Sequence, residues 1–335
     1  MKLILDCMGG DRGPGEFLAG VAQAKAAFGG DYVLVGDSTV LREAANDRKI
    51  ALAGYDVVEA TQVITMEDDP MAVVRAKSES SMSTALRLLA EGQGHAVVSC
   101  GNTGALFLGA SLIIRRVRGV HRAAIATVLP FTPPVLLLDA GANVTVQPDY
   151  LWQFAVMGTA YMKHLFGLER PRVGLLNNGT ESRKGTPLQI EAYDLLSTCP
   201  DIYFVGNVES SMLPFNVCDV VVTDGFTGNV VLKAFEGMGK LVSGRMKDIF
   251  YSTPATKLAA VAVKSHLAQF KHDFDATEYG GSPILGLNRP VIKAHGSSDA
   301  KAVKNAIGQA IRYAETGAVG SISQVFTTSA PHIDT

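Results

Sequence analysis

One pattern occurs twice in the chain and constrains its fold more than any other feature. Residues 96–105 read AVVSCGNTGA, and residues 220–229 read VVVTDGFTGN. In each copy a run rich in β-branched residues leads into the segment Ser/Thr-x-Gly-x-Thr-Gly, and a helix-like run follows, over residues 106–114 and 230–235. Each copy therefore predicts a strand, a tight turn and the N-terminus of a helix.

Both turns are candidate anion sites. Glycine lets the backbone adopt positive φ and approach a ligand closely, while a helix N-terminus offers unpaired N–H groups and a partial positive charge. A purely structural interpretation stays open, in which Ser99, Thr103, Thr223 and Thr227 cap helices and the glycines only turn the chain. The repetition at the same spacing favours the anion sites.

The rest of the chain alternates between strand-like and helix-like runs. Strands are expected at residues 2–7 and 32–35, with helices at 17–28 and 39–45. This rhythm predicts parallel βαβ units, whose loops would all lie at one edge of the sheet, where α/β proteins bind ligands. No low-complexity linker divides the sequence, so we expect a single α/β domain over residues 1–335.

Local signals predict several further elements. Asp69 and Pro70 are typical of a helix start, as are Thr186 and Pro187 after a long polar loop. The other expectations are an amphipathic helix at 148–162, helices at 230–250 and 256–270, a hairpin around Asn288 and Arg289, a last helix capped by Ser297 or Ser298, and a loosely ordered tail after Gly317.

Composition and motifs exclude several classes of protein. The chain has a net charge of -2 and 19% charged residues, whereas a nucleic-acid-binding protein normally has a basic stripe. There is no P-loop, no G-x-G-x-x-G after a strand and no G-x-S-x-G. Histidine and cysteine spacings do not suggest zinc, so we expect neither a metal nor a cofactor. The absence of a signal-peptide core and of a long apolar run favours the cytoplasm, with cysteines as buried hydrophobic residues.

Cationic residues accompany several of the predicted loops. Arg75 and Lys77 are either solvated helix charges or two cations directed at an anion. Arg183 and Lys184 end the long polar loop and are candidates for anion contact. His295 is expected at a strand end beside a helix N-terminus, where a general acid or base would be useful, although single histidines are more often structural.

An apolar run at residues 258–263 is flanked by Lys257 and Lys264. Three interpretations remain open at this point. The run could pack in a dimer, lie among lipid headgroups with the lysines on phosphates, or be buried in the chain's own core.

A series of motifs, in order along nearly the whole chain, resembles the bacterial phosphate acyltransferases of phospholipid synthesis, the phosphate:acyl-[acyl-carrier-protein] acyltransferases. The motifs are Asp6-x-Met8-Gly9-Gly10-Asp11-x-Gly13-Pro14, Asp69-Pro70, Arg75-x-Lys77, Ser80-Ser81-Met82, Gly101-Asn102-Thr103-Gly104-Ala105, Asp139-x-Gly141-Ala142-Asn143, Lys184-Gly185, Gly206-Asn207-Val208-Glu209, Asp224-Gly225-Phe226-x-Gly228-Asn229, Tyr279-Gly280-Gly281 and Ala294-His295-Gly296-Ser297-Ser298.

The resemblance implies a three-layer α/β/α fold with a mostly parallel sheet, like that of isopropylmalate dehydrogenase and phosphotransacetylase. It also implies transfer of an acyl group from acyl carrier protein to inorganic phosphate, with the acyl phosphate passed to a membrane glycerol-3-phosphate acyltransferase. A homodimer is implied, as is a protruding helical pair at residues 236–272 that contacts the inner face of the cell membrane peripherally. The membrane-contact residues would be Leu258, Val261, Val263, Lys257 and Lys264.

The motifs also yield a candidate site, in which both turns hold phosphate and the phosphate attacks the thioester directly. Lys184 would supply counter-charge, Asn102 or Asn229 would donate to the oxyanion, and His295 or Lys293 would move protons or orient phosphate. The catalytic set is Lys184, Asn229, Asp224, His295 and Asn102. The phosphate-binding set is Gly101, Thr103, Gly104, Gly225, Gly228, Arg75 and Lys293.

Two rival functions are compatible with parts of the sequence. A decarboxylating dehydrogenase would need a cluster of metal-binding aspartates, for which Asp139, Asp219 and Asp224 are available. A non-catalytic membrane scaffold would need only the helical pair and a dimer face.

Overall fold

The computed structural model describes residues 1–264, 266 and 276–328. Within them, eleven strands form one sheet in the order β3-β2-β1-β4-β11-β10-β5-β6-β9-β7-β8. The strands are β1 (Lys2–Asp6), β2 (Asp31–Gly36), β3 (Asp56–Glu59), β4 (Ala96–Ser99), β5 (Ala124–Leu129), β6 (Val135–Leu138), β7 (Arg172–Asn177), β8 (Tyr203–Glu209), β9 (Val220–Val222), β10 (Ser282–Leu285) and β11 (Val291–Lys293).

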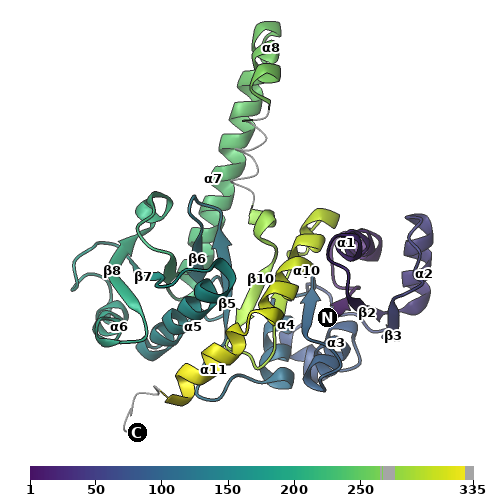
Figure 1. The fold of residues 1–335 in the computed structure, drawn as a ribbon, viewed down its shortest axis with the longest axis horizontal. Coiled ribbons are helices and arrows are strands. Elements are labelled where there is room, and N and C mark those ends of the chain that lie inside the picture. The colour runs from purple at the N-terminus through teal and green to yellow at the C-terminus, as the bar shows by residue number, and fades with distance from the viewer. Residues whose placement is uncertain (265, 267–275, 329–335) are drawn as a thin grey trace.

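Helices cover both faces of this sheet (Figure 1). One face carries α1 (Gly13–Phe28), α2 (Ser38–Asp47), α5 (Pro148–Phe166), α6 (Pro187–Thr198), α10 (Ala300–Glu315) and α11 (Ala318–Thr328). The other carries η1 (Pro70–Val74), α3 (Ser81–Ala90), α4 (Thr103–Gly109), η2 (Ala110–Ile114), η3 (Ser210–Phe215) and the first turns of α7 (Gly225–Tyr251). Successive strand residues point to opposite faces, so Leu3 and Leu5 enter one core and Ile4 the other. The three-layer prediction is confirmed.

Strand direction reverses within the sheet. Strands β1, β2, β3, β4 and β11 are parallel, β10 is antiparallel to both β11 and β5, and β5 is antiparallel to β6. Strands β9, β7 and β8 then follow the direction of β6. The two strands that carry the repeated turns, β4 and β9, therefore run in opposite directions. The prediction that all these loops leave by one edge was wrong.

Two predictions near the C-terminus were also wrong, and they share a cause. The tail after Gly317 forms α11, which packs on α5 and buries Ile322 and Phe326. Because α11 covers its outer side, α5 is buried at every residue from 151 to 162 instead of being amphipathic. Trp152 of α5 meets Phe326 edge to face, with ring centroids 5.6 Å apart.

Helix caps follow the predicted chemistry at most positions. The Asp69 carboxylate accepts from the N–H of Met71 at the start of η1, and Thr186 forms a capping box at the start of α6. The last helix differs, because Asp299, not Ser297 or Ser298, caps α10 by accepting from the N–H of Ala302. The hairpin around Asn288 is confirmed by the antiparallel pairing of β10 and β11.

A helical projection rises from the body of the molecule (Figure 1). Its first helix, α7, has 27 residues, of which only Gly225 and Gly228 are buried. Its second, α8 (Pro254–Ala262), has no buried residue, so burial of residues 258–263 in the chain's own core was not the correct interpretation. Residues 265 and 267–270 of the predicted segment 256–270 lie outside the described residues. None of the helices described is long and apolar enough to cross a membrane.

The packing of α11 gives a stability prediction. Phe326 is 3% exposed, and it contacts Trp152 of the buried helix α5 only if α11 is folded. Phe326→Ala is expected to lower the free energy of unfolding by about 3–5 kcal/mol, the usual cost of deleting a buried aromatic ring. Urea unfolding measures it, with Phe215→Ala, at a ring that is 70% exposed, as the control. Equal effects of the two substitutions would contradict this packing.

Candidate active site

The first repeated turn leads from β4 into α4, which continues into η2 as one helical run. Asn102 caps this run, because its Oδ1 accepts from the N–H of Ala105 at 3.0 Å. Its Nδ2 lies within hydrogen-bonding distance of three carbonyl oxygens, those of Thr65, Met66 and Asp68, at 3.1–3.3 Å. The Asn102 side chain thus ties a neighbouring loop to the turn, and both of its polar ends are occupied.

The structural interpretation of the turn was wrong about the caps, and it did not foresee that the glycines allow close packing. Ser99 and Thr103 do not cap α4. A Cβ added to Gly101 would lie 2.5 Å from Met82 Cε, and one added to Gly9 would lie 2.6 Å from Gly101 Cα. Glycine is therefore needed at residues 9 and 101 for two loops to pass each other.

A row of buried polar side chains supports this turn. Asp6, Ser99 and Lys293 end β1, β4 and β11, and the strand register pairs Asp6 with Ser99 and Ser99 with Lys293. The Asp6 carboxylate accepts from the hydroxyls of Ser99 (2.6 Å) and Ser81 (2.7 Å). Burial raises the pKa of Asp6, and these two hydrogen bonds oppose the rise.

Lys293 is the buried cation of the row, at 8% exposure. Its ammonium donates to the carbonyl oxygens of Cys100, at 3.3 Å, and of Ala294. No carboxylate oxygen of the described residues lies within ion-pair distance of it. Burial lowers the pKa of Lys293, while the negative charges of nearby groups, Asp11 and Asp6 among them, work against that fall.

The first backbone amides of α4 are open. Within the described parts of the chain, the N–H groups of Thr103 and Gly104 have no hydrogen-bond acceptor, and both residues are exposed. The turn therefore combines free N–H groups with a buried, unpaired lysine on the adjacent strand. This is the chemistry of an anion site.

His295 follows β11 directly beyond Lys293. Its Nδ1 lies 2.8 Å from the Ser297 hydroxyl. Partial loss of water around the ring, followed by the positive charges of Lys233 and Lys293, lowers the pKa of His295, whereas Glu236 raises it. Lys233 and Glu236 belong to α7, so the base of the helical projection passes close to His295.

The second repeated turn differs from the first. Asp224, not Thr223 or Thr227, caps α7 by accepting from the N–H of Thr227 at 2.8 Å. The N–H groups of Gly225 and Gly228 donate to the carbonyl oxygens of Asn143 and Asp224. Of the first four amides of α7, only that of Phe226 has no acceptor among the residues the structure describes. Most of the first amides of α7 are therefore unavailable to a ligand.

Its glycines have a packing role. A Cβ on Gly228 would lie 1.9 Å from the Asp139 carbonyl oxygen, and one on Gly225 would lie 2.8 Å from the Asn143 nitrogen. The helix start is thereby pressed against residues 139–143. Asp139 organises that loop, because its buried carboxylate accepts from the backbone N–H groups of Ile125, Gly141, Ala142 and Asn143.

Lys184 and Asn229 lie near this second turn. Lys184 is exposed in the loop after β7, which is parallel to β9, and Asn177 Nδ2 donates to its carbonyl oxygen at 3.0 Å. Asn229 is exposed on α7 beside Gly141. Arg75, exposed at the end of η1 on the side of the first turn, has no ion pair in the described chain, whereas Lys77 pairs with Asp68 at 2.6 Å.

The predicted site residues therefore fall into two groups. Asn102, Thr103, Gly104, Lys293 and His295 lie around the first turn, and Asp224, Gly225, Gly228, Asn229 and Lys184 lie around the second. In the described chain no hydrogen bond joins the groups, and their link is the first part of α7 beside His295. The sequence did not single out Asp6, Ser81, Ser99 and Asp139 as site residues. A signal was available, because each is a polar residue next to an apolar strand or helix.

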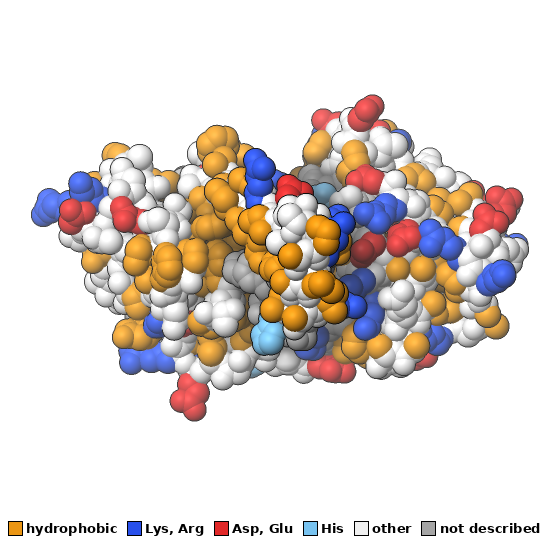
Figure 2. Space-filling view, turned by 90° about the horizontal axis from the view of Figure 1, so that it is seen from above, with side chains coloured by type: hydrophobic (Ala, Val, Ile, Leu, Met, Phe, Trp, Pro, Cys, Tyr) orange, Lys and Arg blue, Asp and Glu red, His pale blue; other side chains and the backbone are white. Residues whose placement is uncertain are grey.

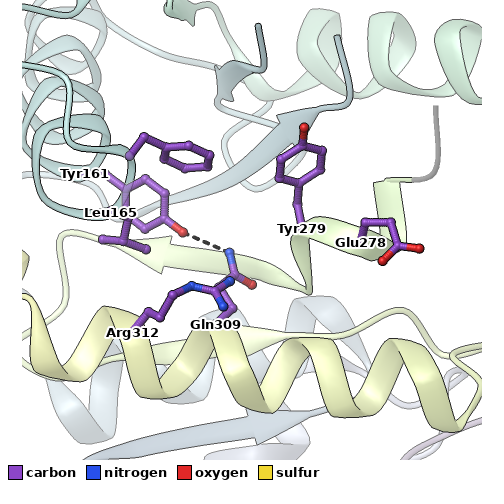
Figure 3. Close-up of a pocket in the computed structure, with 7 residues that line it drawn as sticks. Tyr161, Leu165, Glu278, Tyr279, Gln309 and Arg312 are labelled. Atoms are coloured by element: carbon purple, nitrogen blue, oxygen red, sulfur yellow. Dashed lines mark hydrogen bonds between the residues drawn. The ribbon is translucent and has the colours of Figure 1, made fainter. Parts of the chain in front are cut away.

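A pocket of about 210 Å³ lies elsewhere, between α5, α10 and η4 (Ala276–Tyr279). Figure 3 shows Gln309 inside it, donating to the Tyr161 hydroxyl at 2.9 Å. None of the candidate catalytic or phosphate-binding residues lines this pocket. We therefore do not place the chemistry there.

Comparison with known proteins identifies the family. Residues 1–320 match the model of a family described as fatty acid synthesis protein. Phosphate acyltransferases from Acetivibrio thermocellus and Anoxybacillus flavithermus are each 42% identical over 328 residues, covering 97% of this chain and 96% and 98% of theirs. The Bacillus subtilis phosphate acyltransferase is 42% identical over 92% of this chain and 93% of its own.

The chain belongs to this family. It is accordingly an acyltransferase of lipid synthesis. The phosphate acyltransferase fold is also found in more distant structures. A Streptococcus pyogenes phosphotransacetylase aligns with a TM-score of 0.65 at 16% identity, covering 94% of each chain. A 4-hydroxythreonine-4-phosphate dehydrogenase from Klebsiella pneumoniae aligns with a TM-score of 0.56 at 14% identity, over 94% of this chain and 99% of its own.

The aspartates required by the rival dehydrogenase do not come together in this chain. Asp219 immediately precedes β9 and pairs with Arg172 at 2.8 Å, whereas Asp224 follows the other end of the same strand. Asp139 is surrounded by backbone N–H groups. Across the described residues, no group of three His, Cys, Asp or Glu side chains is arranged to hold a metal ion.

The approach of α7 to His295 can be tested by titration. At low salt, an NMR titration of the His295 ring is expected to give a pKa lowered from the ordinary value of 6.5. Lys233→Met should raise this pKa by removing a positive charge, and Glu236→Gln should lower it. Lys240→Met, two turns farther along α7, is the control and should leave it unchanged. If neither substitution moved the titration, α7 would not lie beside His295.

Proposed function

We propose that this phosphate acyltransferase transfers a fatty acyl group from acyl-[acyl carrier protein] to inorganic phosphate. The products are acyl phosphate and the free carrier thiol. A membrane glycerol-3-phosphate acyltransferase would then consume the acyl phosphate. Family membership supports the reaction class, and the observation that carries the phosphate assignment is the unpaired ammonium of Lys293 beside the open amides of Thr103 and Gly104.

Phosphate binds best at the first turn. An ammonium group has three N–H donors, and two carbonyl oxygens account for two of those of Lys293. Its third donor and the amides of Thr103 and Gly104 would hold phosphate oxygens, with Gly101 allowing the close approach and Arg75 adding charge at the rim. Lys293 is fixed by its carbonyl contacts, so the site needs little rearrangement to accept an anion.

The chemical step needs no covalent enzyme intermediate. An oxygen of hydrogen phosphate attacks the thioester carbon, the C–O bond forms, and the C–S bond breaks. The proton of hydrogen phosphate passes to the departing thiolate, with the His295 ring as a relay, so charge and protons balance. Positioning and stabilisation of the oxyanion would supply most of the rate.

The second turn would receive the thioester. Asn229 is exposed and would donate to the oxyanion, whereas Asn102, whose side chain is occupied, is assigned a positioning role. Lys184 would provide counter-charge. Asp224, Gly225 and Gly228 would hold the start of α7 in place, and the free amide of Phe226 is one further donor.

Membrane contact would come from the tip of the helical projection. Leu258 and Val261 of α8 are 74% and 72% exposed, and Val263, Lys257 and Lys264 are exposed beside them. Figure 2 looks onto this tip and has hydrophobic side chains across its end. Apolar residues flanked by lysines suit the headgroup region of an anionic bilayer at the cytoplasmic face.

A homodimer would cover much of the long helix of the same projection. Helix α7 exposes a series of large apolar side chains along its length, namely Val230, Met238, Leu241, Val242, Ile249 and Tyr251. So many exposed apolar residues on one helix are typical of an interface.

The proposed reaction is tested by mixing the purified protein with an acyl-[acyl carrier protein], with and without inorganic phosphate. Thiol release is expected only with phosphate, with an equal amount of acyl phosphate. In the same assay, Lys184→Met and Asn229→Ala should each reduce turnover by about 10²- to 10³-fold, the usual loss for one charge-stabilising group.

Both side chains are exposed, so thermal unfolding should be unaffected. Lys163→Met, at an exposed lysine of α5, is the matched control and should keep full turnover. Thiol release that does not depend on phosphate would overturn the reaction. Near-normal turnover of the two variants would overturn only the roles of Lys184 and Asn229.

Membrane contact is tested by sedimentation with vesicles of phosphatidylcholine and phosphatidylglycerol. The double substitution Leu258→Glu and Val261→Glu should release most of the bound protein, because it removes apolar area and adds charge that anionic lipid repels. Val57→Glu on the edge strand β3 is the control. Sedimentation of the double variant equal to that of the unsubstituted protein would exclude α8 as the contact.

A further inference from the structure

A short segment between η2 and β5 concentrates positive charge. Residues 115–122 read RRVRGVHR, with four arginines, one histidine and no acidic residue, in a chain whose net charge is -2. The arginine side chains of this segment, Arg115, Arg116, Arg118 and Arg122, are all exposed. We call residues 115–122 the arginine loop.

The backbone of the arginine loop is held firmly. Val117 and Val120 are buried in the core. The N–H of Val117 donates to the Gly286 carbonyl oxygen at 2.9 Å, and Gln153 of α5 bonds the loop at both Gly119 and His121. The arginines thus extend from a fixed support, which reduces the entropy lost when they bind a partner.

The arginines of the loop have no acidic partner within the structure as described. Elsewhere, Arg48, Arg87 and Arg172 pair with Glu16, Glu79 and Asp219 at 2.8–3.0 Å. In the loop, His121 contacts Asp149, and Arg122 lies over the Tyr150 ring. The remaining arginines face solvent with their charges uncompensated.

The loop lies next to the second turn. Residue 123 follows it directly, and Asn143 Nδ2 donates to the Ala123 carbonyl oxygen at 2.8 Å. Asn143 in turn accepts from the N–H of Gly225 at the start of α7. On its other side, Gly119 packs against Phe326 of α11, at the opposite end of the molecule from α8 (Figure 1).

We propose that the arginine loop is a docking surface for a strongly acidic protein, which under the proposed function is the carrier that delivers the acyl thioester. Three arginines without an acidic partner, Arg115, Arg116 and Arg118, extend from a held backbone beside the turn assigned to the thioester and would attract and orient such a partner. Charge complementarity of this kind mainly accelerates association and selects the partner. The proposal rests on the proposed function, and it identifies the surface on which the carrier protein would dock.

The position of the loop favours a protein over a membrane. If α8 contacts the bilayer, the arginine loop at the other end of the molecule faces away from it. Nucleic acid is a poorer candidate, because the basic residues form a compact cluster and not the extended stripe that follows a phosphate backbone.

The test compares two substrates, an acyl-[acyl carrier protein] and a small acyl thioester such as acyl-pantetheine. For the double variant Arg116→Glu and Arg118→Glu, the ratio of kcat/KM for the carrier substrate to kcat/KM for the small thioester should fall about tenfold or more at low salt. The difference from the unsubstituted protein should shrink as salt is added, because salt screens the charges.

Arg42→Glu, at an exposed arginine of α2, makes the same change of charge elsewhere and should keep the ratio. An unchanged ratio for the double variant would overturn the docking proposal, as would a loss confined to the binding of anionic vesicles. Failure of the acyl-[acyl carrier protein] to give acyl phosphate with the unsubstituted protein would instead refute the proposed function. The two failures are therefore distinguishable.

Discussion

The lateral alignment of β1, β4 and β11 underlies the candidate active site. Because these three strands are parallel and in register, their last residues place Asp6, Ser99 and Lys293 in one row beneath the first turn. Burying a carboxylate and an ammonium is costly unless their hydrogen-bonding groups are engaged. Two serine hydroxyls satisfy Asp6, and carbonyl oxygens engage Lys293. No carboxylate of the described residues pairs with the Lys293 ammonium, so a bound anion would supply the missing negative charge.

The reversal of strand direction then decides how the two turns relate to each other. It occurs at the β5–β6 hairpin, where residues 130–134 are too few for the crossover that parallel neighbours require. This short, proline-rich connection can be seen in the sequence, yet the regular alternation of strands and helices suggested a sheet whose strands all run in one direction. With the reversal, the turns leave the sheet in different directions, and α7, which starts at the second turn, carries the charges of Lys233 and Glu236 toward His295.

Elements that depend on neighbouring residues in the sequence were predicted more reliably than the packing of one helix on another. Strands, the hairpin around Asn288 and the caps at Asp69 and Thr186 follow from residue types within a few positions, so sequence sufficed for them. The burial of α5 and the order of α11 depend on each other, and nothing local in residues 318–328 reveals that contact. For the site, Lys293 was predicted to orient phosphate, and that role stays a prediction, although the structure places its strand beside that of the first turn. The engagement of Asn102 by residues 65–68 required the folded structure.

The two repeated turns show how one residue changes what a shared pattern does. At the position before the first glycine, the first copy has Cys100 and the second has Asp224. Cysteine is not a strong cap, so α4 begins only after Asn102 and leaves the amides of Thr103 and Gly104 open. Asp224 is a strong cap, so α7 begins two positions earlier in the pattern, and most of its first amides are used within the fold. The same six-residue pattern therefore gives one turn suited to holding an anion and another suited to anchoring a helix, and only the first has a buried cation beside it.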